Sequence, residues 1–178
     1  MRRVVTGHDN EGHSVVVDDG VPPRTHAFAS FPGFVNSLAW ATEPGEPLNK
    51  LGEDRTGKTE SLLPSPGGTR LLLLEIPPDA ATGSNDFDAA GFAAEQRLHG
   101  PGLAELFEAD GMHTTPTVDY TIVIDGEVWL ELDGGQLTHL SAGDVVIQNG
   151  TRHAWRNRSD RSVTLAAVLV GASVEVRP

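Results

Sequence analysis

Residues 113–157 read HTTPTVDYTIVIDGEVWLELDGGQLTHLSAGDVVIQNGTRHAWRN, and this stretch decides the fold. It consists of short runs rich in β-branched and aromatic residues, separated by turn residues such as those at 125–126. Short strands at this spacing predict an all-β sandwich or small barrel. His113 and His153 stand on segments that should face one another, so the same stretch predicts a site for a small molecule.

Side chains alternate between the two faces of a strand, and this alternation groups the polar residues. On a strand that runs from 113 to 124, His113, Thr115, Thr117 and Asp119 share one face. Tyr120 has the opposite parity, so we expect it between layers or outside the barrel, and not in the site.

The turns divide the rest of this region into further strands. Asp125-Gly126 is typical of a tight hairpin, which predicts that the strands on its two sides pair. On the second of these strands, 127–132, even-numbered residues should face the core. Further strands are predicted at 136–140, 145–148, 153–157 and 163–170.

These residues carry a resemblance to the cupin superfamily, whose two motifs are G-x5-H-x-H-x3-4-E-x6-G and G-x5-P-x-G-x2-H-x3-N. The matching positions are His113, Asp119 and Gly126 in the first motif, and His153 and Asn157 in the second. Three departures stand out: Thr115 replaces the second histidine, Asp119 replaces the glutamate, and Asn149-Gly150 replaces Pro-x-Gly in a second motif that is one residue short. The resemblance implies a double-stranded β-helix, or jelly-roll barrel, with extra N-terminal strands.

The resemblance also implies a role for His113, Asp119 and His153, both as catalytic residues and as ligands of a divalent metal ion. Two imidazoles and one carboxylate are the ligand set of non-haem Fe(II) oxygenases, and Zn, Ni or Mn can use similar donors. The expected function is that of a metal-dependent enzyme acting on a small organic substrate, aromatic or polyketide-like. Dioxygenation, decarboxylation, isomerisation and cyclisation all remain open.

Two alternatives need no metal. In the first, His113 or His153 acts as a general base that Asp119 orients, because an imidazole can move a proton near neutral pH. In the second, the barrel binds a small molecule without chemistry, and the missing histidine at Thr115 supports this version.

Three further residues are candidates for contact with the substrate. Thr115 could hydrogen-bond a substrate oxygen, although β-branched residues are also common in strands for their shape alone. Trp155 shares the parity of His153 and could line an aromatic pocket or fill the core. Gln148 could reach inward as a donor. The remaining histidines lack a ligand-like spacing and are expected to be solvated: His8, His13, His26, His99 and His139.

The N-terminal half should supply strands and loops that pack on the barrel, within a single domain of residues 1–178. Strands are predicted at 2–6 and 13–17, at 34–42, and at the apolar run 69–76. Residues 87–109 form the one helical candidate, interrupted at 100–102, where two short helical turns fit better than one helix. This segment, 87–110, leads into the core motifs at 111–170 and could be a lid or a spacer.

Composition excludes several classes of function. The net charge of −12 disfavours nucleic acid or an anionic membrane surface as a partner. The absence of cysteine excludes disulfides, thiolate metal sites and cysteine nucleophiles. No apolar run approaches the length of a membrane span, so a cytoplasmic protein is expected. A homodimer is expected too, because a second subunit would cover the edges of an N-terminal arm.

Overall fold

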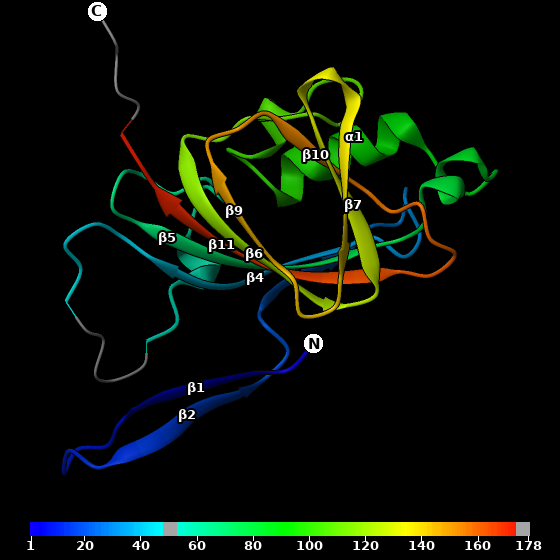
Figure 1. Cartoon of the computed structure of the whole chain (residues 1–178). Coiled ribbons are helices and arrows are strands. Elements are labelled where there is room, and N and C mark those ends of the chain that lie inside the picture. The colour runs from blue at the N-terminus through cyan, green and yellow to red at the C-terminus, as the bar shows by residue number, and fades with distance from the viewer. Residues whose placement is uncertain (48–52, 174–178) are drawn as a thin grey trace, which may run out of the picture.

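The computed structural model describes residues 1–47 and 53–173, and β-strands dominate them (Figure 1). The helical elements are the α-helix α1 (Ala89–His99) and the 3-10 helices η1 (Thr56–Lys58), η2 (Asp79–Gly83), η3 (Ala104–Leu106) and η4 (Asp133–Gly135). The strands are β1 (Arg3–His8), β2 (Ser14–Gly20), β3 (Arg24–Ala27), β4 (Val35–Thr42), β5 (Thr69–Ile76), β6 (Thr117–Asp125), β7 (Glu127–Leu132), β8 (Gln136–Ser141), β9 (Val145–Asn149), β10 (His153–Arg156) and β11 (Val163–Gly171).

Two sheets build the barrel. The larger has the order β3-β4-β5-β11-β6-β9 and the smaller β10-β7-β8. From β6 onward the chain passes repeatedly between the sheets, which is the jelly-roll arrangement of a double-stranded β-helix. The all-β prediction and the strands predicted from 117 to 170 are confirmed.

The predicted hairpin at Asp125-Gly126 is wrong. β6 pairs with β11 and β9, whereas β7 pairs with β10 and β8, so 125–126 is a corner between sheets. Gly126 has φ +84°, a left-handed conformation that suits a corner between two sheets as well as a tight hairpin. The Asp-Gly signal therefore located the turn without deciding which strands it joins.

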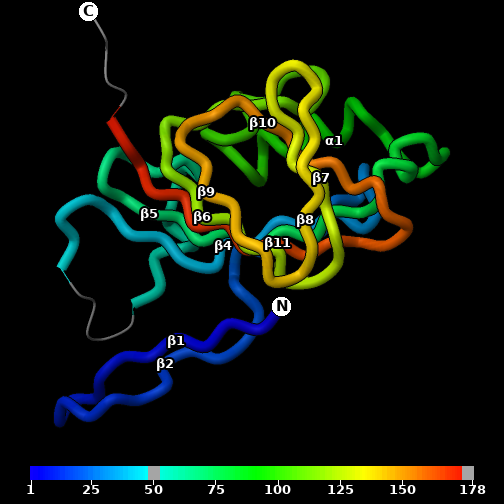
Figure 2. The backbone as a smooth tube through the Cα atoms, in the orientation of Figure 1, coloured from blue at the N-terminus to red at the C-terminus, as the bar shows by residue number. Residues whose placement is uncertain are grey.

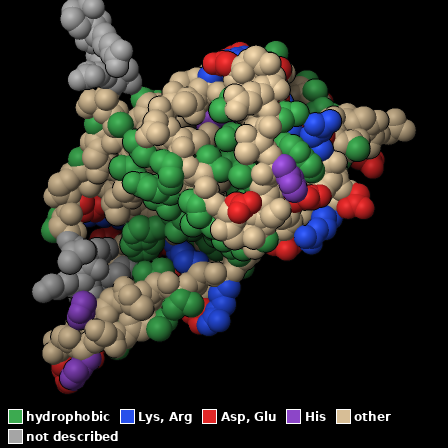
Figure 3. Space-filling model, viewed as in Figure 1, with side chains coloured by type: hydrophobic (Ala, Val, Ile, Leu, Met, Phe, Trp, Pro, Cys, Tyr) green, Lys and Arg blue, Asp and Glu red, His purple; other side chains and the backbone are tan. Residues whose placement is uncertain are grey.

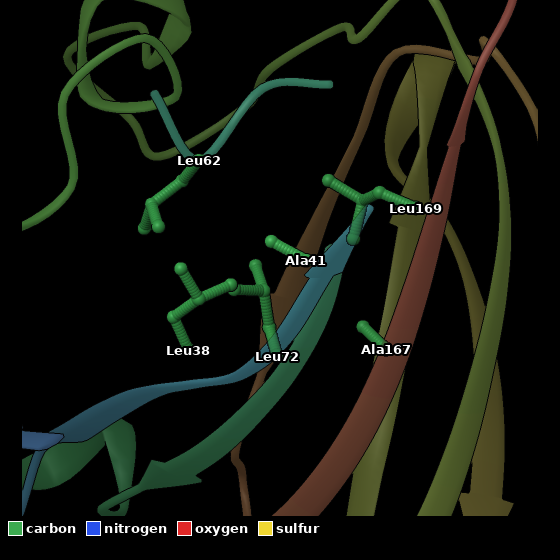
Figure 4. Packing of buried hydrophobic residues seen from close by; sticks show 6 residues of the cluster. All are labelled: Leu38, Ala41, Leu62, Leu72, Ala167 and Leu169. Carbon is green, nitrogen blue, oxygen red and sulfur yellow. The ribbon is translucent and has the colours of Figure 1, made fainter. Parts of the chain in front are cut away.

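Two clusters of buried side chains hold the sheets and their cover together. One lies between the sheets and joins Val123 and Leu165 of the larger sheet to Val128, Leu130 and Leu140 of the smaller. The even-numbered face of β7 is thus buried, as the alternation predicts. The other cluster lies on β4, β5 and β11, beneath the loop residue Leu62 (Figure 4). The inner face of the larger sheet therefore packs against the smaller sheet in one part and against loop residues in another.

The N-terminal half matches the predicted strands at β1, β2, β4 and β5. One strand was missed: β3, a four-residue edge strand that pairs with β4. Its sequence, Arg-Thr-His-Ala, has little apolar character, because an edge strand that is largely exposed needs little.

Strands β1 and β2 pair only with each other and project from the barrel as an arm (Figure 2). Arg3 anchors the arm at its base, where its guanidinium donates to the Ala39 carbonyl over 3.0 Å and to Asp54 over 2.8 Å. Three consecutive valines of β2, residues 15–17, are exposed.

The helical segment breaks where the sequence predicts. Asp88 caps the first turn of α1 by accepting from the Ala90 amide, and Gly100-Pro101-Gly102 separates α1 from η3.

The expectation that His26 and His99 are solvated is wrong, because both are half-buried and their rings stack 3.4 Å apart. His26 lies on β3 and His99 ends α1. Nearby, the Glu95 carboxylate accepts from the Ser30 hydroxyl, from the backbone amides of Ser30 and Ala29, and sits 3.2 Å from His26 Nε2. These contacts attach α1 to the strand β3 and the loop after it.

The same contacts predict a pH-dependent stability. Hydrogen bonds from Ser30, with those from Ala29 and His26, lower the pKa of Glu95 from 4.5 to about 2. The folded state thus favours the ionised carboxylate, and this stabilisation is complete above 4.5 and is lost as the pH falls toward 2. We expect Glu95→Gln to lower the melting temperature at neutral pH, with a difference from the native protein that shrinks between pH 4.5 and 2.

Thermal unfolding monitored by circular dichroism measures this difference. Glu11→Gln, in the exposed loop of the arm, controls for the loss of one negative charge. A difference between native protein and Glu95→Gln that stays constant over the acid range would contradict the prediction.

Candidate functional site

A cavity of about 580 Å³ opens against the inner face of the larger sheet, with residues of α1 and η3 on its walls. All six residues predicted to form a site line it: His113, Thr115, Asp119, Gln148, His153 and Trp155. Tyr120 is 44% exposed on the opposite face of β6, as its parity predicts. Because α1 forms part of the wall, the segment 87–110 has the position that a lid requires, and its movement stays a prediction.

Backbone pairing brings His113 and His153 together. The predicted strand from 113 is interrupted at Pro116, which has no amide hydrogen to donate, and β6 begins at 117. His113 instead forms an isolated antiparallel bridge with His153, in which each amide donates to the other's carbonyl over 2.9 Å. The two ring centroids are consequently 4.2 Å apart.

The contacts of the ring nitrogens decide the tautomer of His153. Its Nδ1 lies 2.8 Å from the Thr151 carbonyl oxygen, which can only accept, so Nδ1 carries the proton. In the neutral ring Nε2 then has a free lone pair. His113 makes a longer contact of the same kind, 3.4 Å from Nδ1 to the Gly111 carbonyl.

Burial favours the neutral form of both rings. It lowers the pKa of His113 to about 4, with a further contribution from the neighbouring His153. Burial also lowers the pKa of His153, although the Thr151 carbonyl and Asp119 both act to raise it. At neutral pH the site therefore holds two uncharged imidazoles, which can accept a proton or coordinate a cation.

Asp119 lies on β6, in the wall of the same cavity. Burial raises its carboxyl pKa, although hydrogen bonds from Thr117 and Thr115 oppose the shift. The Thr115 hydroxyl is 3.4 Å from Asp119 Oδ2 and accepts from the Thr117 hydroxyl over 2.7 Å. Asp119 Oδ1 has no hydrogen-bond partner within the described protein.

A feature that the sequence prediction missed is the aromatic lining of the cavity. The chain has six phenylalanines, and all six line the cavity: Phe28, Phe31, Phe34, Phe87, Phe92 and Phe107. Five pack against one another, with edge-to-face pairs such as Phe28 and Phe34 at 4.9 Å, and the sixth, Phe107, lies 4.3 Å from the ring of His113. Their grouping at 28–34 and 87–92 is a signal in the sequence, but it does not reveal that the two groups meet.

The expected metal centre can be compared with this arrangement. Within residues 1–47 and 53–173, no three side chains of His, Cys, Asp or Glu are grouped so that they could hold a metal ion. The two histidines have the anchored Nδ1 atoms that are typical of metal ligands, but Asp119 does not complete the set. As arranged, these side chains do not fit the predicted three-ligand centre.

Comparison with known proteins identifies the family of this region. A model of the cupin domain family matches residues 107–170, which include all six predicted site residues, on β6, β9, β10 and the segment before β6. Among solved structures, an RmlC-like cupin with a double-stranded β-helix fold from Methanocaldococcus jannaschii is 12% identical, with a TM-score of 0.40 over 60% of this chain and 73% of that chain.

Several curated relatives come from fungi. Phomopsin biosynthesis cluster protein C' of Diaporthe leptostromiformis is 45% identical over 67 residues, 38% of this chain and 34% of that protein. The match thus spans about a third of that relative's length. The cupin-domain-containing oxidoreductase fogC of Aspergillus ruber is 26% identical over 162 residues, 87% of this chain and 63% of that protein.

The family match covers His113, Asp119 and His153, and the strands within it belong to a double-stranded β-helix. Residues 107–170 of this chain belong to the cupin superfamily.

Proposed function

We propose that this cupin is an enzyme that transfers protons on a small organic substrate held in the cavity. The observation that carries the proposal is the division of the cavity wall into two parts. Six phenylalanines offer an apolar surface for the body of a substrate, and His113, Asp119 and His153 offer three buried ionisable groups for its reacting end. An aromatic or polyketide-like substrate suits the apolar part.

His153 is the proposed general base. Its Nδ1 proton is held by the Thr151 carbonyl, so the free lone pair on Nε2 can take a proton from a carbon next to a substrate carbonyl. Burial keeps the ring neutral, and the backbone contact fixes its orientation. The same nitrogen can return the proton at another carbon, which gives isomerisation or starts a cyclisation.

Asp119 is proposed to hold the substrate beside the base. Its Oδ1 has no hydrogen-bond partner within the described protein and can accept from an N–H or O–H of the substrate. Thr115 contacts the other carboxylate oxygen, Oδ2, over 3.4 Å, and Thr117 donates in turn to the Thr115 hydroxyl.

A second candidate is oxidation of the same kind of substrate. It is favoured by the relatives named as cupin-domain-containing oxidoreductases, two of which align with this chain over 162 residues. Such a reaction needs an electron acceptor, and a divalent Fe, Zn, Ni or Mn ion stays the cofactor predicted from the sequence.

Benzylacetone in deuterated water tests the proposal. This ketone has a phenyl ring for the apolar wall and exchangeable protons beside its carbonyl, and proton NMR follows their replacement by deuterium. We expect the native protein to accelerate the exchange and a chelator to leave the rate unchanged. Loss of exchange with the chelator, restored by one divalent ion found by elemental analysis, would instead establish a metal centre. Binding without exchange would favour a binding module.

The homodimer predicted from the sequence is proposed to form through the outer face of the larger sheet. Exposed apolar side chains gather there, and Figure 3 shows them over the region of β6 and β9. Tyr120 and Ile147 are cross-strand neighbours that are 44% and 51% exposed. The outward residues of β6 and β9 from 118 to 147 include no charged side chain, so two chains of net charge −12 could meet there without placing acids together.

Ile147→Asp tests this interface. In a two-fold dimer the substitution buries two carboxylates, and we expect the dissociation constant to rise on the order of 100-fold or more. Light scattering coupled to gel filtration measures the mass. Leu137→Asp, at an exposed position of β8, is the matched control. A native protein that is monomeric at high concentration would contradict the proposal. The cytoplasmic location stays a prediction from the sequence.

A further inference from the structure

We infer that Gln148 and Asp119 form a recognition pair for an uncharged amide at the polar end of the cavity. The inference rests on the proposed function in one respect, since it concerns a ligand of the same cavity. It goes further by naming the chemical group that the ligand presents. It also assigns Gln148 as a residue that determines specificity.

The two side chains are placed to act together. Asp119 on β6 and Gln148 on β9 are directly opposite each other in the antiparallel register, so their side chains leave the same face of the sheet. Both line the cavity, and they are 5% and 3% exposed. A single ligand group at this wall can therefore reach both residues.

Each of them has a polar atom without a partner. Asp119 Oδ1 and Gln148 Nε2 are buried and make no hydrogen bond within the described protein. Buried polar atoms are nearly always hydrogen-bonded, and leaving one unpaired destabilises the folded state. Two such atoms on facing residues of one cavity are best explained by a ligand that satisfies both.

The contacts around these residues leave the two atoms without hydrogen-bond partners inside the protein. Thr115 contacts Oδ2 of Asp119 and leaves Oδ1. Only four buried side-chain atoms in the described ranges lack a partner, and three belong to residues of this cavity: Asp119 Oδ1, Gln148 Nε2 and Asn36 Oδ1. Among the described residues, buried side-chain atoms without a hydrogen-bond partner are thus concentrated at the cavity.

The chemistry of the two atoms defines the ligand. Gln148 Nε2 donates, so it needs an acceptor such as a carbonyl oxygen, and Asp119 Oδ1 accepts from a ligand N–H. An amide carries this acceptor and this donor side by side in one plane. A ligand carboxylate would place a second negative charge beside the unpaired Oδ1 of Asp119, and like charges so close repel.

Four probes with one phenylethyl body test the inference: hydrocinnamamide, its N,N-dimethyl derivative, methyl hydrocinnamate and hydrocinnamate. The dimethylamide and the ester keep the carbonyl acceptor and lose the N–H donor. We expect the native protein to bind the primary amide about tenfold more tightly than either of them, as one hydrogen bond to a buried charged group allows, and to bind the carboxylate most weakly. Titration calorimetry at neutral pH gives the dissociation constants.

Gln148→Leu removes the donor while keeping a similar volume. We expect its affinity for the amide to fall about tenfold and its melting temperature to equal or exceed that of the native protein, because an unpaired buried amide has been removed. Gln136→Leu makes the same change at an exposed position of β8 and should keep native affinity. Because the comparison of probes on the native protein needs no variant, it decides the matter even where a variant fails to fold.

The inference is overturned if no probe binds, if the native protein binds amide and ester equally, if the carboxylate binds best, or if Gln148→Leu keeps native affinity for the amide. The exchange assay with benzylacetone tests the proposed function independently of these binding measurements. Exchange without a preference for the amide overturns this inference and leaves the proposed function standing. A preference for the amide without exchange supports the inference and contradicts the proposed proton transfer.

Discussion

His153→Gln is expected to lower the rate of proton exchange in benzylacetone by a factor of about 10²–10⁴, the contribution of a positioned general base. Glutamine can reproduce the hydrogen bond to the Thr151 carbonyl, but it has no basic nitrogen to replace Nε2. The substitution therefore removes the base and keeps a polar side chain of similar size. Proton NMR of the ketone in deuterated water measures the rate.

His139→Gln is the matched control, because it makes the same change on β8, where His139 is exposed and paired with Glu127. This control should exchange at the native rate. Circular dichroism must show that His153→Gln is folded. A folded variant that keeps more than about a tenth of the native rate would assign the base to another residue, since the loss would lie below the usual range for this role.

Gly126→Ala is expected to destabilise the fold by about 3 kcal/mol. Part of the loss comes from φ +84°, a left-handed conformation that is unfavourable for alanine. The rest comes from crowding, because a Cβ at this position would lie 3.0 Å from both the Ser162 carbonyl oxygen and Val163 Cα. Both contacts are with backbone, so neither neighbour can move aside as a flexible side chain could.

Gly134→Ala separates the two contributions. Gly134 has φ +73° in the turn between β7 and β8, and a Cβ added there would meet nothing within 4 Å. Alanine at this position should lose only about 1 kcal/mol, from the backbone conformation alone. Urea denaturation measures both free energies of unfolding. Equal losses in the two variants would show that the contacts at the corner contribute nothing.

These two glycines show what a local sequence signal can predict and what it cannot. Asp125-Gly126 and Asp133-Gly134 look alike in the sequence, and both predict a turn with positive φ. Only the second joins paired strands, because β7 and β8 lie in one sheet whereas β6 and β7 lie in different sheets. Partner choice depends on which apolar faces meet in the core, and a dipeptide carries no information about that.

The candidate site was predictable to a similar extent. Alternation along 113–119 and the spacing of the two motifs grouped His113, Asp119 and His153, and the structure has all three on the wall of one cavity. They did not predict that Pro116 interrupts the first strand, or that the three side chains are not grouped so that they could hold a metal ion. Metal coordination depends on side-chain positions within fractions of an ångström, which backbone parity does not specify.

By itself the sequence determined the all-β class, most strand positions, the break in the helical segment and the face on which the site lies, because these follow from periodicity and turn chemistry within a few neighbouring residues. Only the tertiary structure decided the strand partners on either side of the 125–126 corner, the lining of one cavity by six phenylalanines from distant segments and the unpaired atoms of Asp119 and Gln148. These features depend on contacts between residues far apart in the chain, and such contacts are settled by how the sheets and α1 pack together.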